Sequence, residues 1–528
     1  MNPLQIMAEL INNGTLSLVL VAIFVILLYR WSSSTSTSST KKSPPSPPKL
    51  PVIGNLHQLG SPLHRSLQAL SQIHGPLMLL HFGSVPVLVV SSAEAAREIM
   101  KTHDLAFSGR PKSTASEKLL YNYKDVAFAP YGEYWRQVKS ICVLNLLSNK
   151  RVRSFRGVRE DETKAMITKI RETSTSGGVV NLRTMLMTLT NDVVSRVALG
   201  RKYYSDPGFK ELSVEFTELV GSLNIGDYIP WLAWLSRASG LDAKLVKLAK
   251  RYDDFLERVL QEHIDKSSNT TSNTNGHGHV LIDENQNEDN KDFVDVLLEI
   301  QQENLLGFCL DRVSVKAVIL DMFLAGTDTT GTLLEWAMAE ILKHPRVMSK
   351  LQKEVRGVSK EEDEILTEDD LVDMHYLKAV IKEVLRLHPP FTLLLPRMST
   401  QDVKINGYNI EANTQVLVNA WQIGRDPKSY NHKPEEFEPE RFMNDNSGLS
   451  YIGNDFQFIP FGAGRRVCPG IQFATTVNEI ALANLLHKFD WTLAGGIRNA
   501  DLDMTESSGL TIHKKYPLQA VPIPYSSA

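Results

Sequence analysis

Cysteine is scarce in this chain of 528 residues, which contains only Cys142, Cys309 and Cys468. The three are far apart and odd in number, and no CxxC pair occurs. Zinc ribbons and redox dithiols need closely spaced pairs, so both are poor interpretations. A disulfide framework is equally disfavoured, which predicts a reducing compartment for most of the chain.

An excess of charge is also absent, since 57 basic residues stand against 60 acidic ones and the net charge is −3. Nucleic-acid binding needs a basic excess or stripe, so no nucleic-acid partner is expected. Hydrophobic residues make up 42% of the chain and charged residues 22%, which allows a large core. No repeat of fixed period is visible.

Charged side chains are missing altogether between Leu10 and Tyr29. This apolar run is long enough to cross a bilayer as a helix, and Arg30 and three lysines follow it. The positive-inside rule then predicts a single membrane anchor over residues 1–30, with the rest of the chain in the cytosol. A cleaved signal peptide is the alternative, but it calls for a basic segment before the apolar run.

Residues 31–51 are rich in serine and threonine and then in proline, which predicts a flexible run followed by a stiff spacer. Residues 52–528 have the mixture of apolar and polar residues that one folded domain is expected to have. A β-hairpin is expected over 77–90, where two apolar runs flank Gly83-Ser84. Apolar spacing predicts long helices around 155–172, 207–222, 240–265, 312–342, 346–356 and 376–388. Residues 267–292 are polar and acidic, which indicates a surface loop.

The stretch "FGAGRRVCPG", residues 461–470, places Cys468 in a glycine-rich loop. A lone thiolate surrounded by backbone amides is what a haem iron needs as an axial ligand. Arg466 offers a fork that matches a haem propionate. A buried structural cysteine remains the alternative interpretation. A dinucleotide loop fails, because Val467 stands where the third glycine of GxGxxG would be.

The stretch "AGTDTT", residues 325–330, lies within the longest expected helix. Ala325 and Gly326 remove side-chain bulk, and a hydroxyl such as that of Thr329 can bond back to the preceding turn. Asp328 and Thr329 together can relay protons through water. A packing contact of small residues is the competing interpretation, and the residues alone favour it, because a glycine within a helix usually has a packing reason.

These motifs, in this order, resemble those of the cytochrome P-450 superfamily, which implies a mainly α fold with a small β region. The match runs from the Pro-rich segment almost to the C-terminus and is similar to plant microsomal enzymes, psoralen-synthase-type enzymes in particular. It implies that Glu383 and Arg386 of "KEVLRLHPP" form a buried structural network with Arg441 of "PERF". Without the resemblance, Glu383 and Arg386 would be taken for a surface pair.

The resemblance implies haem b with its iron bound by Cys468. The other residues that it assigns to the cofactor are Trp135, Lys139, Ala325, Gly326, Arg397, Phe461, Gly464, Arg466 and Gly470. Lys139 stands where the family has an arginine, so its contact with a propionate is in doubt and Arg136 is a substitute. Asp328 and Thr329 are the expected catalytic pair.

The implied activity is that of a monooxygenase that uses O₂ and oxidises a small lipophilic plant metabolite. No flavin or nicotinamide motif is visible, so the resemblance implies a separate NADPH-dependent reductase on the endoplasmic reticulum membrane, with the catalytic domain facing the cytosol. Substrate would contact segments near 108–128, 317–329, 389–395 and 507–511, with Thr392, Ser507 and Ser508 as polar contacts. A same-fold dehydratase, such as an aldoxime dehydratase, and a non-catalytic haem protein are the alternatives.

Overall fold

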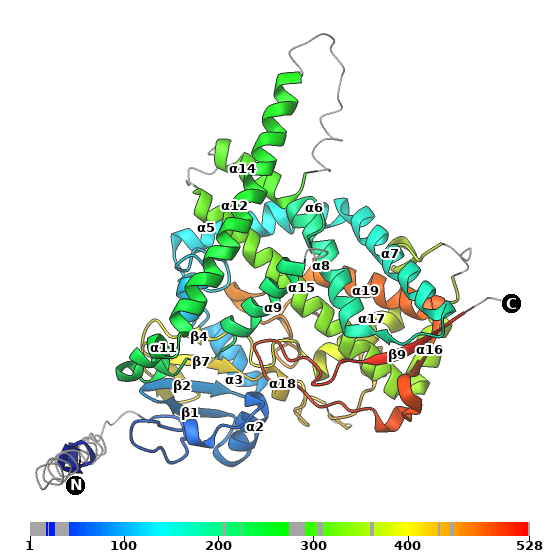
Figure 1. The fold of residues 1–528 in the computed structure, drawn as a ribbon. Helices are drawn as coiled ribbons and strands as arrows, with labels where there is room; N and C mark the ends of the chain where they lie inside the picture. The colour runs from blue at the N-terminus through cyan, green and yellow to red at the C-terminus, as the bar shows by residue number, and fades with distance from the viewer. Residues whose placement is uncertain are drawn as a thin grey trace, which may run out of the picture.

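The computed structural model describes residues 17–19, 21–26, 42–203, 207–222, 224–273, 291–303, 310–358, 364–430, 433–443 and 448–525. Most of the described chain is helical, and the strands lie on two separate sides of the helical body (Figure 1). The helices are α2 (Leu63–His74), α3 (Ala93–Arg97), α4 (Thr114–Leu119), α5 (Glu133–Ile141), α6 (Asn149–Ser154), α7 (Arg156–Thr175), α8 (Leu182–Leu199), α9 (Pro207–Val220), α10 (Ile225–Tyr228), α11 (Trp234–Ala238), α12 (Leu241–Asn273), α14 (Phe293–Glu303), α15 (Arg312–Lys343), α16 (Pro345–Val355), α17 (His375–Leu387), α18 (Ala420–Ile423) and α19 (Ile471–Lys488). The expected fold class, mainly α with a small β region, is confirmed.

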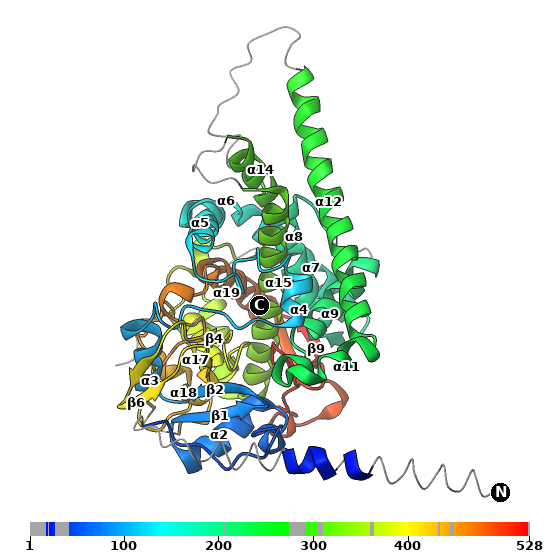
Figure 2. The same cartoon turned by 90° about the vertical axis from the view of Figure 1, so that its left-hand side faces the viewer.

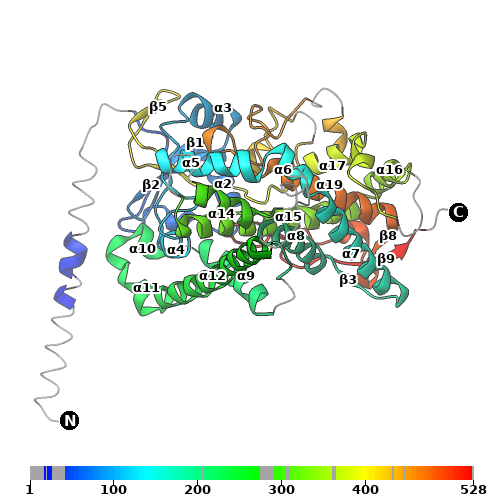
Figure 3. The same cartoon turned by 90° about the horizontal axis from the view of Figure 1, so that it is seen from above.

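Helix α15 runs through the middle of the helical body, where it packs against α8 and α19 (Figure 3). Its first residue follows Asp311, whose side chain caps the helix by accepting a hydrogen bond from the Ser314 amide. Both ends of α15 are buried nearly all round, in line with its apolar composition on every face. The long helices expected from apolar spacing are all present as α7, α9, α12, α15, α16 and α17.

The largest sheet has the strand order β1-β2-β7-β4 and includes the expected hairpin. Its strands are β1 (Leu77–Phe82), β2 (Val85–Val90), β4 (Arg397–Met398) and β7 (Gln415–Val418). Side chains alternate across β2, so that Leu88 and Val90 face one apolar cluster while Val87 and Val89 face another. The smaller sheets are β3-β9-β8 and β5-β6, formed by β3 (Val180–Asn181), β5 (Val403–Ile405), β6 (Tyr408–Ile410), β8 (Phe489–Leu493) and β9 (Gln519–Pro524).

The Pro-rich segment is fastened to the sheet region from Lys42 onward. The Leu79 amide donates to the Pro45 carbonyl (2.9 Å), and the Asn409 amide donates to that of Lys42 (2.8 Å). This half of the expected linker 31–51 is therefore held against the folded body. Residues 31–41, with the Ser/Thr run, lie outside the described residues.

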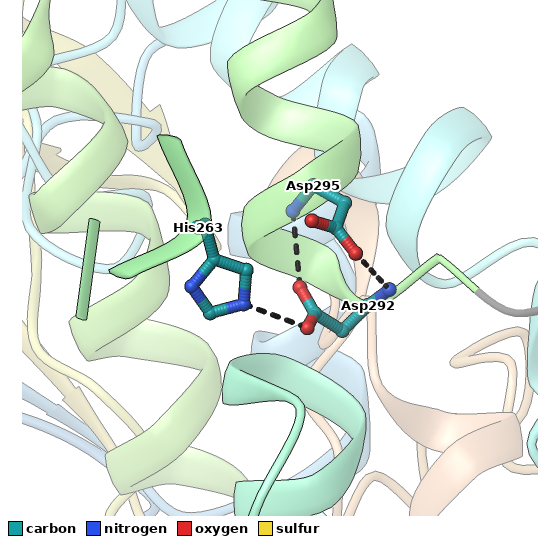
Figure 4. A group of neighbouring side chains, drawn as sticks. All are labelled: His263, Asp292 and Asp295. Carbon is teal, nitrogen blue, oxygen red and sulfur yellow. Dashed lines mark hydrogen bonds and ion pairs between the residues drawn. The ribbon is translucent and has the colours of Figure 1, made fainter. Parts of the chain in front are cut away.

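Helix α12 projects from the body and extends to Asn273 (Figure 2), so the loop expected over 267–292 begins later than predicted. Residues 274–290 lie outside the described part of the chain. Near the base of the projection, His263 Nε2 contacts Asp292 Oδ2 at the start of α14 (2.9 Å; Figure 4). Asp295 donates its amide to Asp292 Oδ1 (3.0 Å). Because the second imidazole nitrogen contacts the Val259 carbonyl (2.7 Å), this group joins α12 to α14 with its partners already in place.

A short apolar helix spans Ser17–Ile26 within the expected anchor. Its described side chains are exposed and include Phe24 and Ile26. In the described part of the chain, α15 is the helix with the length and composition of a membrane span, but most of its apolar window is buried in the body. Helix α15 is therefore a core helix.

Candidate functional site

The cysteine loop, residues 461–470, leads directly into α19. The Cys468 amide donates to the Phe461 carbonyl (3.1 Å), which closes the loop on itself. Gly464 has a φ of +69°, and a side chain there would overlap the Met100 carbonyl. Glycine is therefore needed at position 464 both for the left-handed backbone and for the close approach.

Burial raises the pKa of the Cys468 thiol, whereas a hydrogen bond from the Gly470 amide and the nearby Lys139 ammonium lower it. Lys139 Nζ donates to the carbonyl of Val467, next to the cysteine (2.7 Å). Cys142 differs, because it is fully buried in the core and burial raises the pKa of its thiol to about 12. Cys309 lies outside the described residues. Of the two described cysteines, Cys468 is the one placed to bind a metal.

Arg466 is buried, and its guanidinium donates hydrogen bonds to main-chain carbonyls. Its Nε donates to Ser108 (3.0 Å) and its Nη2 to Ala129 (2.6 Å). The guanidinium also stacks on the ring of Trp135, 4.2 Å from the ring centre. Trp135 in turn donates its indole N–H to the Val126 carbonyl (3.0 Å). The structure thus brings together two residues that the sequence assigned to the cofactor.

Arg397 and Arg110 complete what we call the arginine cluster, which consists of Arg110, Arg397 and Arg466. Arg397 Nη2 donates to the Ala463 carbonyl of the cysteine loop (2.6 Å), and its Nη1 pairs with Asp104 (3.2 Å). Arg110 Nε donates to the Ala127 carbonyl (2.7 Å). Sequence reasoning missed Arg110, because a lone arginine in "FSGRP" has no local signal of burial.

Positive charge is crowded in the arginine cluster. Burial lowers the pKa of Arg466 to about 10, and the charge of Arg397 adds to this effect. Burial, Arg466 and Arg397 also lower the pKa of Arg110. The anions acting on these arginines are Asp104 and Asp125, and burial raises the pKa of Asp125 to about 6. A dianionic ligand would relieve this imbalance, so the donor set fits a haem with two propionates beside a cysteine ligand.

The middle of α15 is accessible, whereas the turns on either side are buried. Ala325 is exposed and Asp328 and Thr329 are partly exposed, although the helix is buried at 314–320 and 330–342. Thr329 Oγ1 donates to the Ala325 carbonyl (2.6 Å), which confirms the expected back-bond. Gly326 lies against α8, where an added Cβ would be 3.0 Å from Val194. Close packing therefore explains Gly326, and its contact with a haem stays a prediction.

Asp328 faces the C-terminal segment of the chain. Its Oδ1 lies 3.4 Å from His513 Nε2, while its buried Oδ2 has no hydrogen-bond partner among the described residues. Burial acts to raise the pKa of Asp328, but the hydrogen bond and charge of His513, together with the Thr511 hydroxyl and the charge of Arg183, outweigh it, and the pKa lies below its usual value. No local pattern pointed to His513, which is 185 residues further along the chain.

Asp321 connects the accessible part of α15 to the arginine cluster. Its Oδ2 accepts hydrogen bonds from the amides of Val126 (2.5 Å) and Ala127 (3.2 Å). The carbonyl of Val126 accepts from Trp135 Nε1 (3.0 Å) and Arg466 Nη1 (3.3 Å). Helix α15 is thus joined to Trp135 and Arg466, two residues that the sequence assigned to the cofactor, through the segment around Val126.

The predicted buried network is confirmed. Arg386 makes two bonds of 2.7 Å to the two oxygens of Glu383, and both side chains are completely buried. Arg441 Nε reaches Glu383 Oε1 at 3.3 Å. Arg386 also donates to the carbonyls of Gly424 (2.7 Å) and Pro434 (2.6 Å). Every charge in this group is satisfied within the protein, as a structural network requires.

The three hydroxyls expected to contact substrate all have partners within the protein. Thr392 Oγ1 contacts His64 Nδ1 (3.2 Å) and Ser508 contacts Ser61. Ser507 Oγ accepts from the His513 amide (3.2 Å). These contacts hold the 505–514 segment in place, so a substrate role for Thr392, Ser507 or Ser508 gains no support.

Comparison with known proteins gives matches over nearly the whole chain. A family model described as Cytochrome P450 matches residues 44–519. The chain is 64% identical to Cytochrome P450 736A117 of Prunus mume, covering 99% of this chain and 100% of the relative. It is 53% identical to norfluorocurarine oxidase of Strychnos sp, covering 97% and 98%.

A solved structure of a zebra fish cytochrome P450 with abiraterone superposes with a TM-score of 0.70 at 25% identity. The alignment covers 89% of this chain and 100% of that structure. Cytochrome P450 71A25 of Arabidopsis thaliana is 51% identical, covering 92% of this chain and 94% of the relative. These relatives do not bear on the narrower likeness to psoralen-synthase-type enzymes, which stays a prediction.

Proposed function

Because the chain belongs to the cytochrome P450 family, we propose that it hydroxylates, or oxidatively cleaves or cyclises, a small lipophilic plant specialised metabolite. A member of this family is a monooxygenase with a cysteine-ligated haem, and NADPH supplies its electrons through a reductase. The candidate substrates are coumarins, terpenoids, flavonoids and alkaloids. Support comes from the plant relatives, one of which is named as an oxidase of norfluorocurarine, and from the accessible apolar residues Ala325 and Leu393–Leu395.

Cys468 is the proposed iron ligand, and the arginine cluster is proposed to hold the propionates. When bound, the haem supplies an iron that activates O₂, helped by electron donation from the thiolate. The Gly470 amide moderates that donation by its hydrogen bond to the sulfur. Lys139 places a positive charge near the sulfur, because its ammonium donates to the Val467 carbonyl. This role takes the place of the direct propionate contact that the sequence left in doubt.

Asp328 and Thr329 are proposed to deliver protons from the accessible side of α15. The Thr329 hydroxyl proton is directed to the Ala325 carbonyl, so the oxygen is left to accept a proton from water. Asp328 keeps one buried oxygen without a partner among the described residues, and that oxygen can accept a further hydrogen bond. An acid and an alcohol one residue apart on an accessible helix face suit a relay through water.

The chain is further proposed to be a single-pass protein of the endoplasmic reticulum membrane, with its catalytic domain in the cytosol. The exposed apolar side chains of the Ser17–Ile26 helix and the basic residues that follow the apolar run support this orientation. A membrane-bound NADPH–cytochrome P450 reductase is the proposed electron donor. Protease protection of sealed microsomes tests the orientation, since a lumenal catalytic domain would resist digestion.

The observation that carries the assignment is the closed loop in which Cys468 receives an amide hydrogen bond beside the arginine cluster. The test is the carbon monoxide difference spectrum of the reduced protein, which should show the far-red-shifted band of thiolate-ligated haem. Cys468→Ala should abolish this band, and Cys142→Ala is the matched control that should keep it. Loss of the band in Cys142→Ala and not in Cys468→Ala would overturn the assignment.

Substrate class is tested by expression with a plant reductase and a screen of coumarins, flavonoids, terpenoids and alkaloids. Products that gain the mass of one oxygen, and that need both NADPH and O₂, support monooxygenation. A product formed without NADPH and O₂ would instead identify a dehydratase or rearranging enzyme of the same fold.

A further inference from the structure

We propose that His513 positions Asp328 and holds the proton that this carboxylate passes on. The inference rests on the proposed role of Asp328 in proton delivery and extends it to a residue on a different part of the chain. It is carried by the geometry of three side chains, those of Asp328, His513 and Thr332.

Thr332 fixes which nitrogen of His513 carries a proton. The Thr332 hydroxyl donates its one proton to the Asp328 carbonyl (2.7 Å). Its oxygen, 2.8 Å from His513 Nδ1, is therefore left to accept, so that Nδ1 is the N–H donor. The orientation of the imidazole is thus set from α15 itself, one turn beyond Asp328.

His513 Nε2 then faces Asp328 Oδ1 at 3.4 Å. With Nδ1 protonated, a bare Nε2 and an ionised carboxylate would be two acceptors facing each other. One proton between them removes the repulsion, and it resides on His513 as an imidazolium or on Asp328 as a carboxylic acid. Contacts of this kind are often long before the reacting complex forms.

The segment that carries His513 is fastened to the core. The Ile512 amide donates to the Pro390 carbonyl (2.9 Å), and Trp336 of α15 donates its indole N–H to the Ile512 carbonyl (2.9 Å). The amide of Ser507 donates to the His513 carbonyl (2.8 Å). These hydrogen bonds to the main chain of Ile512 and His513 therefore hold the imidazole in a fixed position relative to α15.

The charged side chains of Arg183 and Lys514, which lie near the Asp328–His513 pair, have other partners. Arg183 acts on Asp328 from α8, but its Nε is paired with Glu335 (2.8 Å). Lys514 follows His513 in sequence, and its ammonium lies over the Trp336 ring, 5.4 Å from the ring centre. Both side chains of the pair are 23% exposed, so solvent can replace the proton that leaves.

The proposed step transfers one proton and no electron. Asp328 passes a proton toward Thr329, His513 Nε2 restores it to Asp328 Oδ1, and water reprotonates His513. Without this supply, reduced oxygen leaves as hydrogen peroxide, which consumes one NADPH per O₂. With it, and with no metabolite present, O₂ is reduced to two waters at a cost of two NADPH.

The test uses the haem-loaded full chain with a plant reductase and no added metabolite, and measures NADPH consumed per peroxide released from pH 6 to 9. The wild type should consume clearly more than one NADPH per peroxide throughout this range. His513→Gln should keep the carbon monoxide band and release close to one peroxide per NADPH. His74→Gln, at the end of α2, is the matched control and should behave as the wild type.

Two further variants separate a proton-holding role from a structural one. Asp328→Asn should give the same peroxide yield, and the double variant should be no worse than Asp328→Asn alone, because His513 acts through Asp328. His513→Lys restores a cation opposite Asp328 but should not restore the wild-type yield.

The inference is overturned if His513→Gln keeps the wild-type yield, or if its effect adds in full to that of Asp328→Asn. A wild-type protein that forms no thiolate-haem band and consumes no NADPH would instead overturn the proposed function itself.

Discussion

Two groups of buried arginines lie in this molecule, and they differ in how their charge is balanced. Arg386 and Arg441 share the carboxylate of Glu383, and their remaining described hydrogen bonds go to main-chain carbonyls. The arginine cluster instead holds three guanidiniums whose pKa values burial lowers, two of them further through their like-charged neighbours. Removing one partner of the balanced network leaves a buried charge uncompensated, whereas the excess of positive charge in the arginine cluster is the basis on which we propose that an anionic cofactor binds there.

The largest expected effect comes from removing the anion of the balanced network. Glu383→Ala leaves the fully buried guanidinium of Arg386 without a carboxylate and Arg441 with only the more distant one of Glu438 (3.7 Å), which should lower the free energy of unfolding by about 3–5 kcal/mol. Denaturant unfolding of the haem-free protein measures this loss. Glu436→Ala is the control, because its side chain is 52% exposed and pairs with the exposed Lys433, and it should cost less than about 1 kcal/mol. Equal stability of the two variants would remove the distinction between the networks.

The second prediction concerns the unbalanced cluster. Arg466→Ala should speed haem loss about tenfold, since a charge-assisted contact to a propionate is worth about 1.5–3 kcal/mol. It should reduce the stability of the haem-free protein less than Glu383→Ala does. The neighbouring Arg465→Ala is a sharp control, because that side chain is 52% exposed. Haem transfer to an acceptor apoprotein measures the rates, and equal rates in the two variants would contradict the role of Arg466.

Arg110 tests whether the cluster extends beyond the residues that its motif predicts. Arg110→Gln should speed haem loss about threefold, a smaller effect because it also removes the repulsion between the like charges of Arg110 and Arg466. Arg136→Gln is the comparison, since Arg136 was the substitute first considered for Lys139. If Arg136→Gln releases haem faster than Arg110→Gln, the cluster has been defined with the wrong residue.

The smallest effect is expected at the His263–Asp292 pair, whose charge balance depends on pH. Burial acts to lower the pKa of His263, but its bonds to Asp292 and the Val259 carbonyl outweigh this and raise the pKa above its ordinary 6.5. The stabilisation is therefore complete below pH 6.5 and is lost as the pH rises through the raised pKa. His263→Gln should cost about 1 kcal/mol at pH 6 and less at pH 9, as seen in denaturant unfolding at the two values. A cost independent of pH would show that the imidazole does not bind an extra proton on folding.

Local motifs made the fold and the cysteine loop predictable from the sequence, and long-range contacts limited the rest. The spacing of apolar residues predicted the long helices, because burial of one or more faces determines that spacing. Arg110 and His513 were missed, since each meets its partners only after the chain has folded. The end of α12 was also predicted too early, because the polar residues 267–273 carry no apolar period although the helix continues through them.

The peptide unit around Val126 has a consequence of its own. Its amide is held by Asp321 of α15, and its carbonyl receives Trp135 and Arg466. A shift of the middle of α15 must therefore also move the Val126 carbonyl, and with it the hydrogen bonds from Trp135 and Arg466. A displacement on one side of this peptide unit is thus transmitted to the other side.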